Sequence, residues 1–248
     1  MAHGSNSLRW GIRIAPALAI AAAIAAGVRA SSDGAEPTKG VKPSCPAESS
    51  AEECAPAFSG EVSPIDSHTR ARMKGISWRP GCPVGLDDLR LVEVTHWGFD
   101  QAAHKGRLVV RAGLAQGMLR VMETLYRNRF PIRGMRLIDA YGASDRKSMA
   151  ADNTSAFNCR FVSGQPGVWS QHAYGRAIDV NPVENPYVTS SGYVSPPAGR
   201  PYAKRSRRAP GMVHAGDATK RAFAKAGWEW GGNWPWPKDY QHFSSNGH

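Results

Sequence analysis

The stretch "WSQHAYGRAIDVNP", Trp169–Pro182, places His172 and Asp179 on either side of a glycine and ends in an apolar run. A continuous strand would direct two side chains at this spacing to opposite faces. A continuous helix would align them, but Gly175 and the β-rich end of the stretch argue against a helix. The sequence therefore predicts a turn at Tyr174 and Gly175, a short strand after it, and one pocket that both side chains face.

A second segment with the same kinds of side chain lies near the C-terminus. In "KDYQHFS", residues 238–244, Asp239 stands three positions before His242. Pro235 and Pro237 precede it and restrict the backbone that leads to it. We expect this segment to be extended and to bring an acid and an imidazole to the same pocket.

Together the two segments supply two imidazoles and two carboxylates. His172, His242 and Asp179 suit Zn²⁺, which in catalytic sites takes three protein ligands and leaves one position for water. Bound zinc lowers the pKa of water to about 7, so that hydroxide can attack an amide carbonyl. Asp239 would then take and return the proton as general base and acid. The alternatives are a turn cap for Asp239 and an arginine partner for Asp179.

The remaining patterns predict an α+β fold with an antiparallel sheet. Strand-like alternation or apolar runs occur at 88–99, 106–112, 135–143 and 176–182. Helical spacing of apolar residues occurs at 112–130, where Pro131 ends the pattern, and a shorter helix is expected at 217–228. The apolar stripe of the longer helix consists of Leu114, Met118, Val121, Met122 and Leu125.

The N-terminus has the layout of a secretory signal. Arg9 and Arg13 precede the apolar run "IAPALAIAAAIAAGV", and small residues follow at the expected cleavage position. Residues 1–30 are therefore expected to be a signal peptide or, if they are not cleaved, an N-terminal anchor. Residues 31–74, rich in Ser, Pro and Ala, are expected to be a flexible linker, and 75–248 the catalytic domain.

The four cysteines fit an oxidising, extracellular location. They allow three pairings, of which the most economical joins Cys45 with Cys54 and Cys82 with Cys159. A zinc site built from cysteines is disfavoured, because no two of them have C-x-x-C spacing.

The formal net charge of +11 indicates an anionic partner or environment. Nucleic acid is disfavoured, because no zinc-finger, RNA-recognition or helix-turn-helix signature occurs. The basic segment 199–211, "GRPYAKRSRRAPG", is either a solvated loop or a contact to anionic cell-wall polymer. The four tryptophans of 227–237 are expected to pack on the sheet and wall the cleft, with a sugar-stacking platform as the alternative.

The two histidine segments also carry a family resemblance. "SQHAYGRAID" fits the S-x-H-x-x-G-x-A-x-D motif of the zinc D-alanyl-D-alanine carboxypeptidase family, which includes the VanY- and VanX-type D,D-peptidases, and "DYQHF" resembles its closing base-x-x-His segment. The resemblance covers roughly 81–244. It implies zinc ligands at His172, Asp179 and His242, an acid/base at Asp239, and a substrate contact at Ser170.

The same resemblance implies the fold and the substrate. The fold would be a small α+β one of the hedgehog/D,D-peptidase type, with a central antiparallel sheet flanked by helices. The substrate would be the peptide stem of peptidoglycan, cut as a D-alanyl-D-alanine carboxypeptidase. The alternatives are an L-alanyl-D-glutamate endopeptidase of the same fold and a non-catalytic wall-binding module with structural zinc. No obligate protein partner is evident.

The sequence departs from the family where many members carry S-G-Y-R, whose arginine steadies the carbonyl oxyanion. The corresponding "DAYGASDRKS", 139–148, has no arginine after the tyrosine. A fixed positive charge there contributes a few kcal/mol to transition-state stabilisation, so Arg146 and Arg160 are the candidates. Arg160 is favoured because a bridge at Cys159 would anchor it; the alternative for both is a surface arginine. Two loop residues are expected to contact a substrate ammonium or amide: Asp152 and Asn153.

Overall fold

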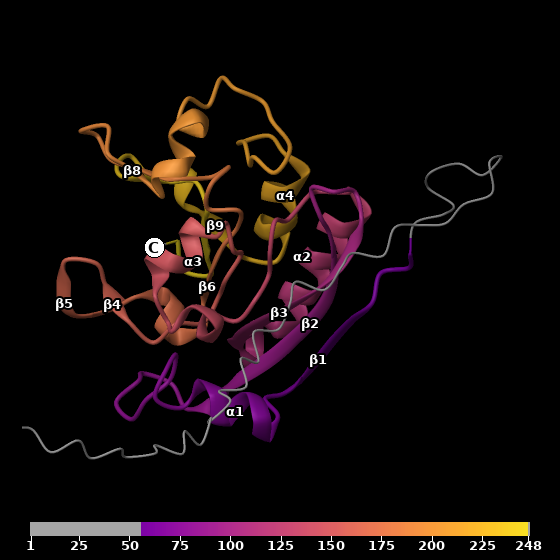
Figure 1. Ribbon diagram of the computed structural model, residues 1–248, viewed down its shortest axis with the longest axis vertical. Coiled ribbons are helices and arrows are strands. Elements are labelled where there is room, and N and C mark those ends of the chain that lie inside the picture. The colour runs from indigo at the N-terminus through magenta and orange to yellow at the C-terminus, as the bar shows by residue number, and fades with distance from the viewer. Residues whose placement is uncertain (1–55, 248) are drawn as a thin grey trace, which may run out of the picture. The chain divides into compact units, whose positions relative to one another are not determined.

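The computed structural model describes residues 56–247 (Figure 1). The predicted secretory segment, the Cys45–Cys54 pair and most of the predicted linker lie outside the described residues. Within residues 56–247, no helix combines the length and the apolar character that crossing a membrane requires.

The first sheet is antiparallel, with the order β1 (Gly60–Pro64), β2 (Leu89–Trp97) and β3 (Ala103–Arg111). Strands β2 and β3 confirm the strands that were predicted at 88–99 and 106–112. Their side chains alternate between two buried clusters, because successive residues of a strand point to opposite faces. Val92 lies in the larger cluster and Leu91 in the smaller one.

Helix α2 (Ala115–Arg127) packs on this sheet and begins from a short 3₁₀ turn, η2 (Ala112–Leu114). The predicted stripe is confirmed: Met118, Val121, Met122 and Leu125 are buried, and Leu114 packs partly against them. Helix α4 (Ala218–Lys225) matches the second predicted helix and lies beside α2 in Figure 1.

The second sheet has the order β6 (Ala177–Asp179), β11 (His242–Ser244) and β9 (Glu229–Trp230), also antiparallel. Ile178 and Phe243, the middle residues of β6 and β11, are fully buried. The Phe243 ring stacks on Phe223 of α4 with 3.9 Å between the ring centroids. This packing fixes the two strands that carry Asp179 and His242.

An extended segment joins the two sheets. Phe157 donates its backbone N–H to Val109 O of β3, while Ser155 and Asp179 exchange both backbone hydrogen bonds at 2.9 and 3.1 Å. The α+β class is confirmed. The single central sheet that was expected consists instead of two small sheets that this segment connects.

The other elements lie around this centre. The hairpin of β4 (Phe161–Val162) and β5 (Gln165–Trp169) extends from one side in Figure 1. A third sheet has the order β10 (Lys238–Asp239), β7 (Tyr187–Val188) and β8 (Val194–Ser195). The short helices and 3₁₀ turns are α1 (Ser67–Met73), α3 (Asp145–Ala150), η1 (Leu86–Asp88), η3 (Ile138–Tyr141), η4 (Gln171–Tyr174), η5 (Pro197–Tyr202) and η6 (Gly231–Asn233).

The predicted strand 135–143 is wrong. Residues 138–141 form the 3₁₀ turn η3, which Gly142 closes with φ 63° and an N–H bond to Asp139 O. The buried residues Met135 and Ile138 are three positions apart, the spacing of a helical turn. A short apolar run of this kind does not distinguish a strand from a turn.

The predicted linker is wrong over 60–73, where the chain forms β1 and α1. Strand β1 pairs with β2, and Asp66 caps α1 by accepting a hydrogen bond from Thr69 N at 2.9 Å. Ile65 and Met73 are buried in the smaller cluster. These few apolar residues are enough to order a segment whose composition is otherwise that of a linker.

The predicted Cys82–Cys159 disulfide is present, with 5.9 Å between the Cα atoms. Cys159 belongs to the smaller buried cluster, and Cys82 packs against that cluster. The bridge therefore ties the segment before the β4–β5 hairpin to the layer under β2 and β3.

Candidate metal centre

The three predicted ligands converge. One ligand atom each from His172, Asp179 and His242 lies within 4.8 Å of the other two, and all three residues are buried. The antiparallel register of strands β6 and β11 brings two of the three ligands together, because it places Asp179 directly opposite His242. Residues 63 positions apart in the chain are thus cross-strand neighbours.

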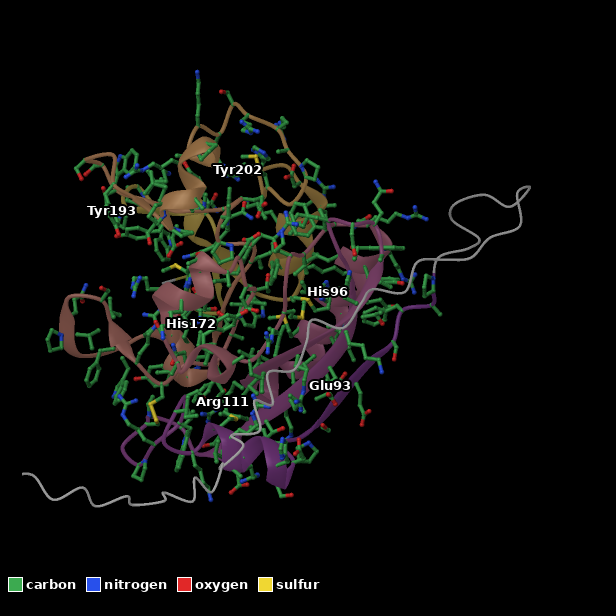
Figure 2. All side chains as sticks on the ribbon, viewed as in Figure 1. Glu93, His96, Arg111, His172, Tyr193 and Tyr202 are labelled. Atoms are coloured by element: carbon green, nitrogen blue, oxygen red, sulfur yellow. A yellow bond between two sulfur atoms is a disulfide. The ribbon has the colours of Figure 1, made fainter. Side chains whose placement is uncertain are left out.

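His172 reaches the pocket through a tight turn. It lies in η4, at the base of the β4–β5 hairpin (Figure 2), and the turn ends at Gly175 with φ 67°. A Cβ atom at Gly175 would approach Arg111 N to 2.7 Å, so the site needs a glycine for both its backbone conformation and its space. The predicted turn is therefore present.

A backbone carbonyl fixes the His172 ring. Nδ1 of His172 lies 2.6 Å from Ala156 O, in the segment that joins the two sheets. Nδ1 donates this hydrogen bond, which leaves the lone pair on Nε2, as is typical of metal-binding histidines.

Asp179 lies between the two imidazoles. Its Oδ2 is 3.2 Å from His172 Nε2 and its Oδ1 is 3.1 Å from His242 Nδ1. Burial alone would raise the pKa of Asp179, but the charges and hydrogen bonds of the two histidines hold it well below its ordinary value. Burial likewise disfavours charge on His172, but the nearby Asp179 carboxylate outweighs it and raises the His172 pKa.

The donor set fits a divalent cation. Nε2 of His242 is buried without a hydrogen-bond partner, which is costly for a polar atom that has no other use. Nε2 of His172 is also buried, and apart from its contact with the Asp179 carboxylate at 3.2 Å it has no hydrogen-bond partner. Two imidazoles and a carboxylate form a set that Zn²⁺ favours in catalytic sites. His172, Asp179 and His242 would hold it.

Asp239 adds a second acid to the pocket. Strand β10 carries it, and its Oδ1 is buried without a hydrogen-bond partner. Burial, followed by the charge of Asp179, raises the pKa of Asp239 to about 7. A Cβ at Gly231 would approach Asp239 O to 2.6 Å, so a glycine there permits this placement. Asp239 can therefore both accept and donate a proton near neutral pH.

The structure distinguishes the two arginine candidates. Arg160 forms an ion pair with Asp145, with 3.0 Å between Nη2 and Oδ2. The Arg160 carbonyl accepts a hydrogen bond from Ser170 N, the N-cap of the turn that carries His172, so the arginine lies beside that turn. Its charge contributes to the pKa of both His172 and Asp239. Arg146 is exposed on α3.

Ser170 is next to the metal ligands but has a local role. It is the N-cap of η4, and its Oγ accepts a hydrogen bond from His172 N at 3.4 Å. Its N–H donates to Arg160 O at 3.1 Å. Ser170 thus links the turn that carries His172 to the arginine.

Asn153 and Asp152 make contacts within the protein. The Asn153 amide bonds to the backbone N and O of Arg136 and to Ser148 Oγ. Oδ1 of Asp152 accepts a hydrogen bond from Val183 N at 2.9 Å. These contacts hold the Asn153 amide and one carboxylate oxygen of Asp152 within the protein, and a contact of either residue with substrate stays a prediction.

Two features of the site were not predicted. The Ala156 carbonyl has no signal in the sequence, because any residue supplies one. Asp145 stands in "SDRKS", where Ser144 is the N-cap of α3, and that pattern alone indicates only a helix start. Of the four tryptophans, Trp228 and Trp230 are buried as expected, Trp234 lies 5.4 Å from His242 between ring centroids, and Trp236 is exposed.

The comparison with protein families agrees with this geometry. The model of a family described as D-alanyl-D-alanine carboxypeptidase matches residues 163–245. The matched range contains His172, Asp179, Asp239 and His242, and the predicted resemblance is therefore confirmed. No curated protein and no solved structure matches the chain.

Proposed function

We propose that this chain, similar over residues 163–245 to D-alanyl-D-alanine carboxypeptidases, is a zinc-dependent peptidase that hydrolyses peptidoglycan stem peptides. A D-alanyl-D-alanine carboxypeptidase activity is the first choice. The observation that carries the proposal is the convergence of His172, Asp179 and His242 beside Asp239. A purely structural site has no need of a further carboxyl whose oxygen is buried without a hydrogen-bond partner.

When bound, zinc would activate water and polarise the scissile carbonyl. Residues of the chain transfer the proton and stabilise the developing charge. Asp239 takes the proton that the attacking water loses and returns it to the amine leaving group. The guanidinium of Arg160 faces the negative charge that develops on the carbonyl oxygen, a contribution that a fixed cation makes most effectively in a partly dry site.

Secretion to the cell wall is part of the proposal. The Cys82–Cys159 disulfide supports it, because such bridges persist in oxidising compartments. So does the secretory layout of residues 1–30, which leaves an uncleaved anchor as the alternative. The formal charge of +11 favours contact with anionic wall polymer. The basic segment contributes only partly, since Arg205 packs over the Tyr240 ring at 4.4 Å.

Digestion of purified muropeptides tests the function. We expect the zinc-loaded protein to release free D-alanine from pentapeptide stems, detected by mass spectrometry of the products. Cleavage between L-alanine and D-glutamate would instead identify an endopeptidase. If no stem peptide is cut by protein that has bound one zinc per chain, the proposal is wrong.

A further inference from the structure

The ion pair between Asp145 and Arg160 borders the metal pocket. Oδ2 of Asp145 lies 3.0 Å from Nη2 of Arg160, and the two side chains are 32% and 28% exposed. Both charges act on His172 and on Asp239. Helix α3 supplies Asp145, and Arg160 stands at the start of the β4–β5 hairpin. Arg160 O accepts a hydrogen bond from Ser170 N, the N-cap of the turn that carries His172, so the pair lies close to a metal ligand.

The backbone of Arg160 is held firmly. It follows Cys159, which the disulfide fixes. Its N–H donates to Asn158 O at 2.9 Å, and its carbonyl accepts from Ser170 N at 3.1 Å. Asn158 N in turn donates to His172 O at 3.1 Å. The arginine backbone is thus connected through short hydrogen bonds to the turn that carries a metal ligand.

The side chain of Arg160 has fewer restraints. Nη1 reaches Phe161 O at a long 3.4 Å, and Nε is buried without a hydrogen-bond partner. The contact of Nη2 with Asp145 is the short, charge-assisted one. An arginine has several rotatable bonds, so loss of this contact would free its guanidinium to rotate toward solvent.

We propose that Asp145 is a positioning residue that holds the Arg160 guanidinium toward the carbonyl oxygen of the substrate. The inference rests on the proposed peptidase function. A preorganised charge stabilises a developing oxyanion because it needs no rearrangement during the reaction. Asp145 would therefore affect kcat through Arg160 without contact to the substrate or to the metal.

Asp145→Asn tests the inference, because it removes the charge and keeps the shape. Removing one oxyanion donor costs on the order of 10²–10³ in kcat. A donor that is present but loose should cost less, and we expect kcat to fall by about 10-fold to about 100-fold. KM and zinc content should change little. Asp145→Glu, which keeps the charge, should recover part of the loss.

Binding of a phosphinate dipeptide, whose tetrahedral anion resembles the transition state, gives a second readout. Its affinity should fall in Asp145→Asn by the same factor as kcat. The matched control is Asp87→Asn, which removes one carboxylate from an exposed ion pair with Arg70. This control should leave kcat and phosphinate affinity unchanged.

Two results of the kinetic and binding measurements would overturn the inference. One is an Asp145→Asn protein with wild-type kcat and phosphinate affinity. The other is a loss that follows the melting temperature and is not relieved by Asp145→Glu, since a structural role would behave in this way. Nitrogen-15 spectra of the arginine side chains provide a test without substrate: the Arg160 signal should show faster side-chain motion in Asp145→Asn, and unchanged motion would refute positioning. A wild-type protein that cuts no stem peptide would contradict the proposed function alone.

Discussion

Replacement of Asp239 by asparagine separates proton transfer from metal binding. Asn has the shape of Asp but no titratable group. The Asp239 Oδ1 atom has no hydrogen-bond partner to lose, and the trio of ligands does not include this residue. We therefore expect Asp239→Asn to fold and to retain one zinc per chain.

The expected loss of activity follows from the role of the carboxyl. General acid–base catalysis by a positioned side chain contributes about 10²–10⁴-fold. With its pKa raised to about 7, Asp239 is well matched to neutral pH. We expect kcat/KM to fall about 10³-fold, which corresponds to about 4 kcal/mol of transition-state stabilisation.

The same substitution that lowers activity should raise the free energy of unfolding of the metal-free protein at neutral to alkaline pH. The Asp239 pKa is raised in the folded state from 3.8 to about 7, so folded protein binds this proton more tightly than unfolded chain. Its contribution is fully present below pH 3.8 and is lost as pH rises through about 7. The loss amounts to at most about 4 kcal/mol. Metal-free Asp239→Asn should therefore be the more stable protein above about pH 7.

The assay combines D-alanine release, zinc content and denaturant unfolding, each measured from about pH 5 to about pH 9. Wild-type and Asp239→Asn proteins are compared at equal zinc occupancy. If the variant retains more than about a tenth of the wild-type kcat/KM, Asp239 is not the proton carrier. Loss of zinc from the variant would equally contradict the separation of roles.

Three variants test the surroundings of the site. Replacing both Cys82 and Cys159 by serine removes a disulfide between residues 77 positions apart in the sequence. This should lower the free energy of unfolding, measured in urea, by about 4 kcal/mol. Phe243→Ala removes a fully buried ring beside His242 and should cost about 3–5 kcal/mol, with weaker zinc binding by calorimetry; a cost below about 1 kcal/mol would contradict the packing. Asn153→Ala removes hydrogen bonds within the protein and should lower stability by roughly 2–4 kcal/mol while kcat/KM per zinc-loaded enzyme stays unchanged. A selective rise in KM would instead restore the predicted substrate contact.

The metal trio was predictable because its residues lie in short segments with clear local signals. Gly175 marks the turn before β6, and the apolar residues around Asp179 and His242 mark buried strands. Antiparallel pairing of those strands is then enough to bring the two ligands together.

The other features depend on contacts that a local pattern does not encode. Strand β1 is ordered by its pairing with β2, and η3 by the burial of Ile138, although composition and periodicity favoured a linker and a strand. Asp145 meets Arg160 only after α3 and the hairpin have packed together. The sequence was thus enough to predict the metal ligands, but not the groups that orient the side chains of the site.

Anomalous diffraction at the zinc absorption edge tests the central claim most directly. Crystals of the zinc-loaded protein should show one strong peak per chain, bound by His172, Asp179 and His242 and completed by solvent. An ion bound elsewhere, or one enclosed by a fourth protein ligand with no solvent position, would contradict the account.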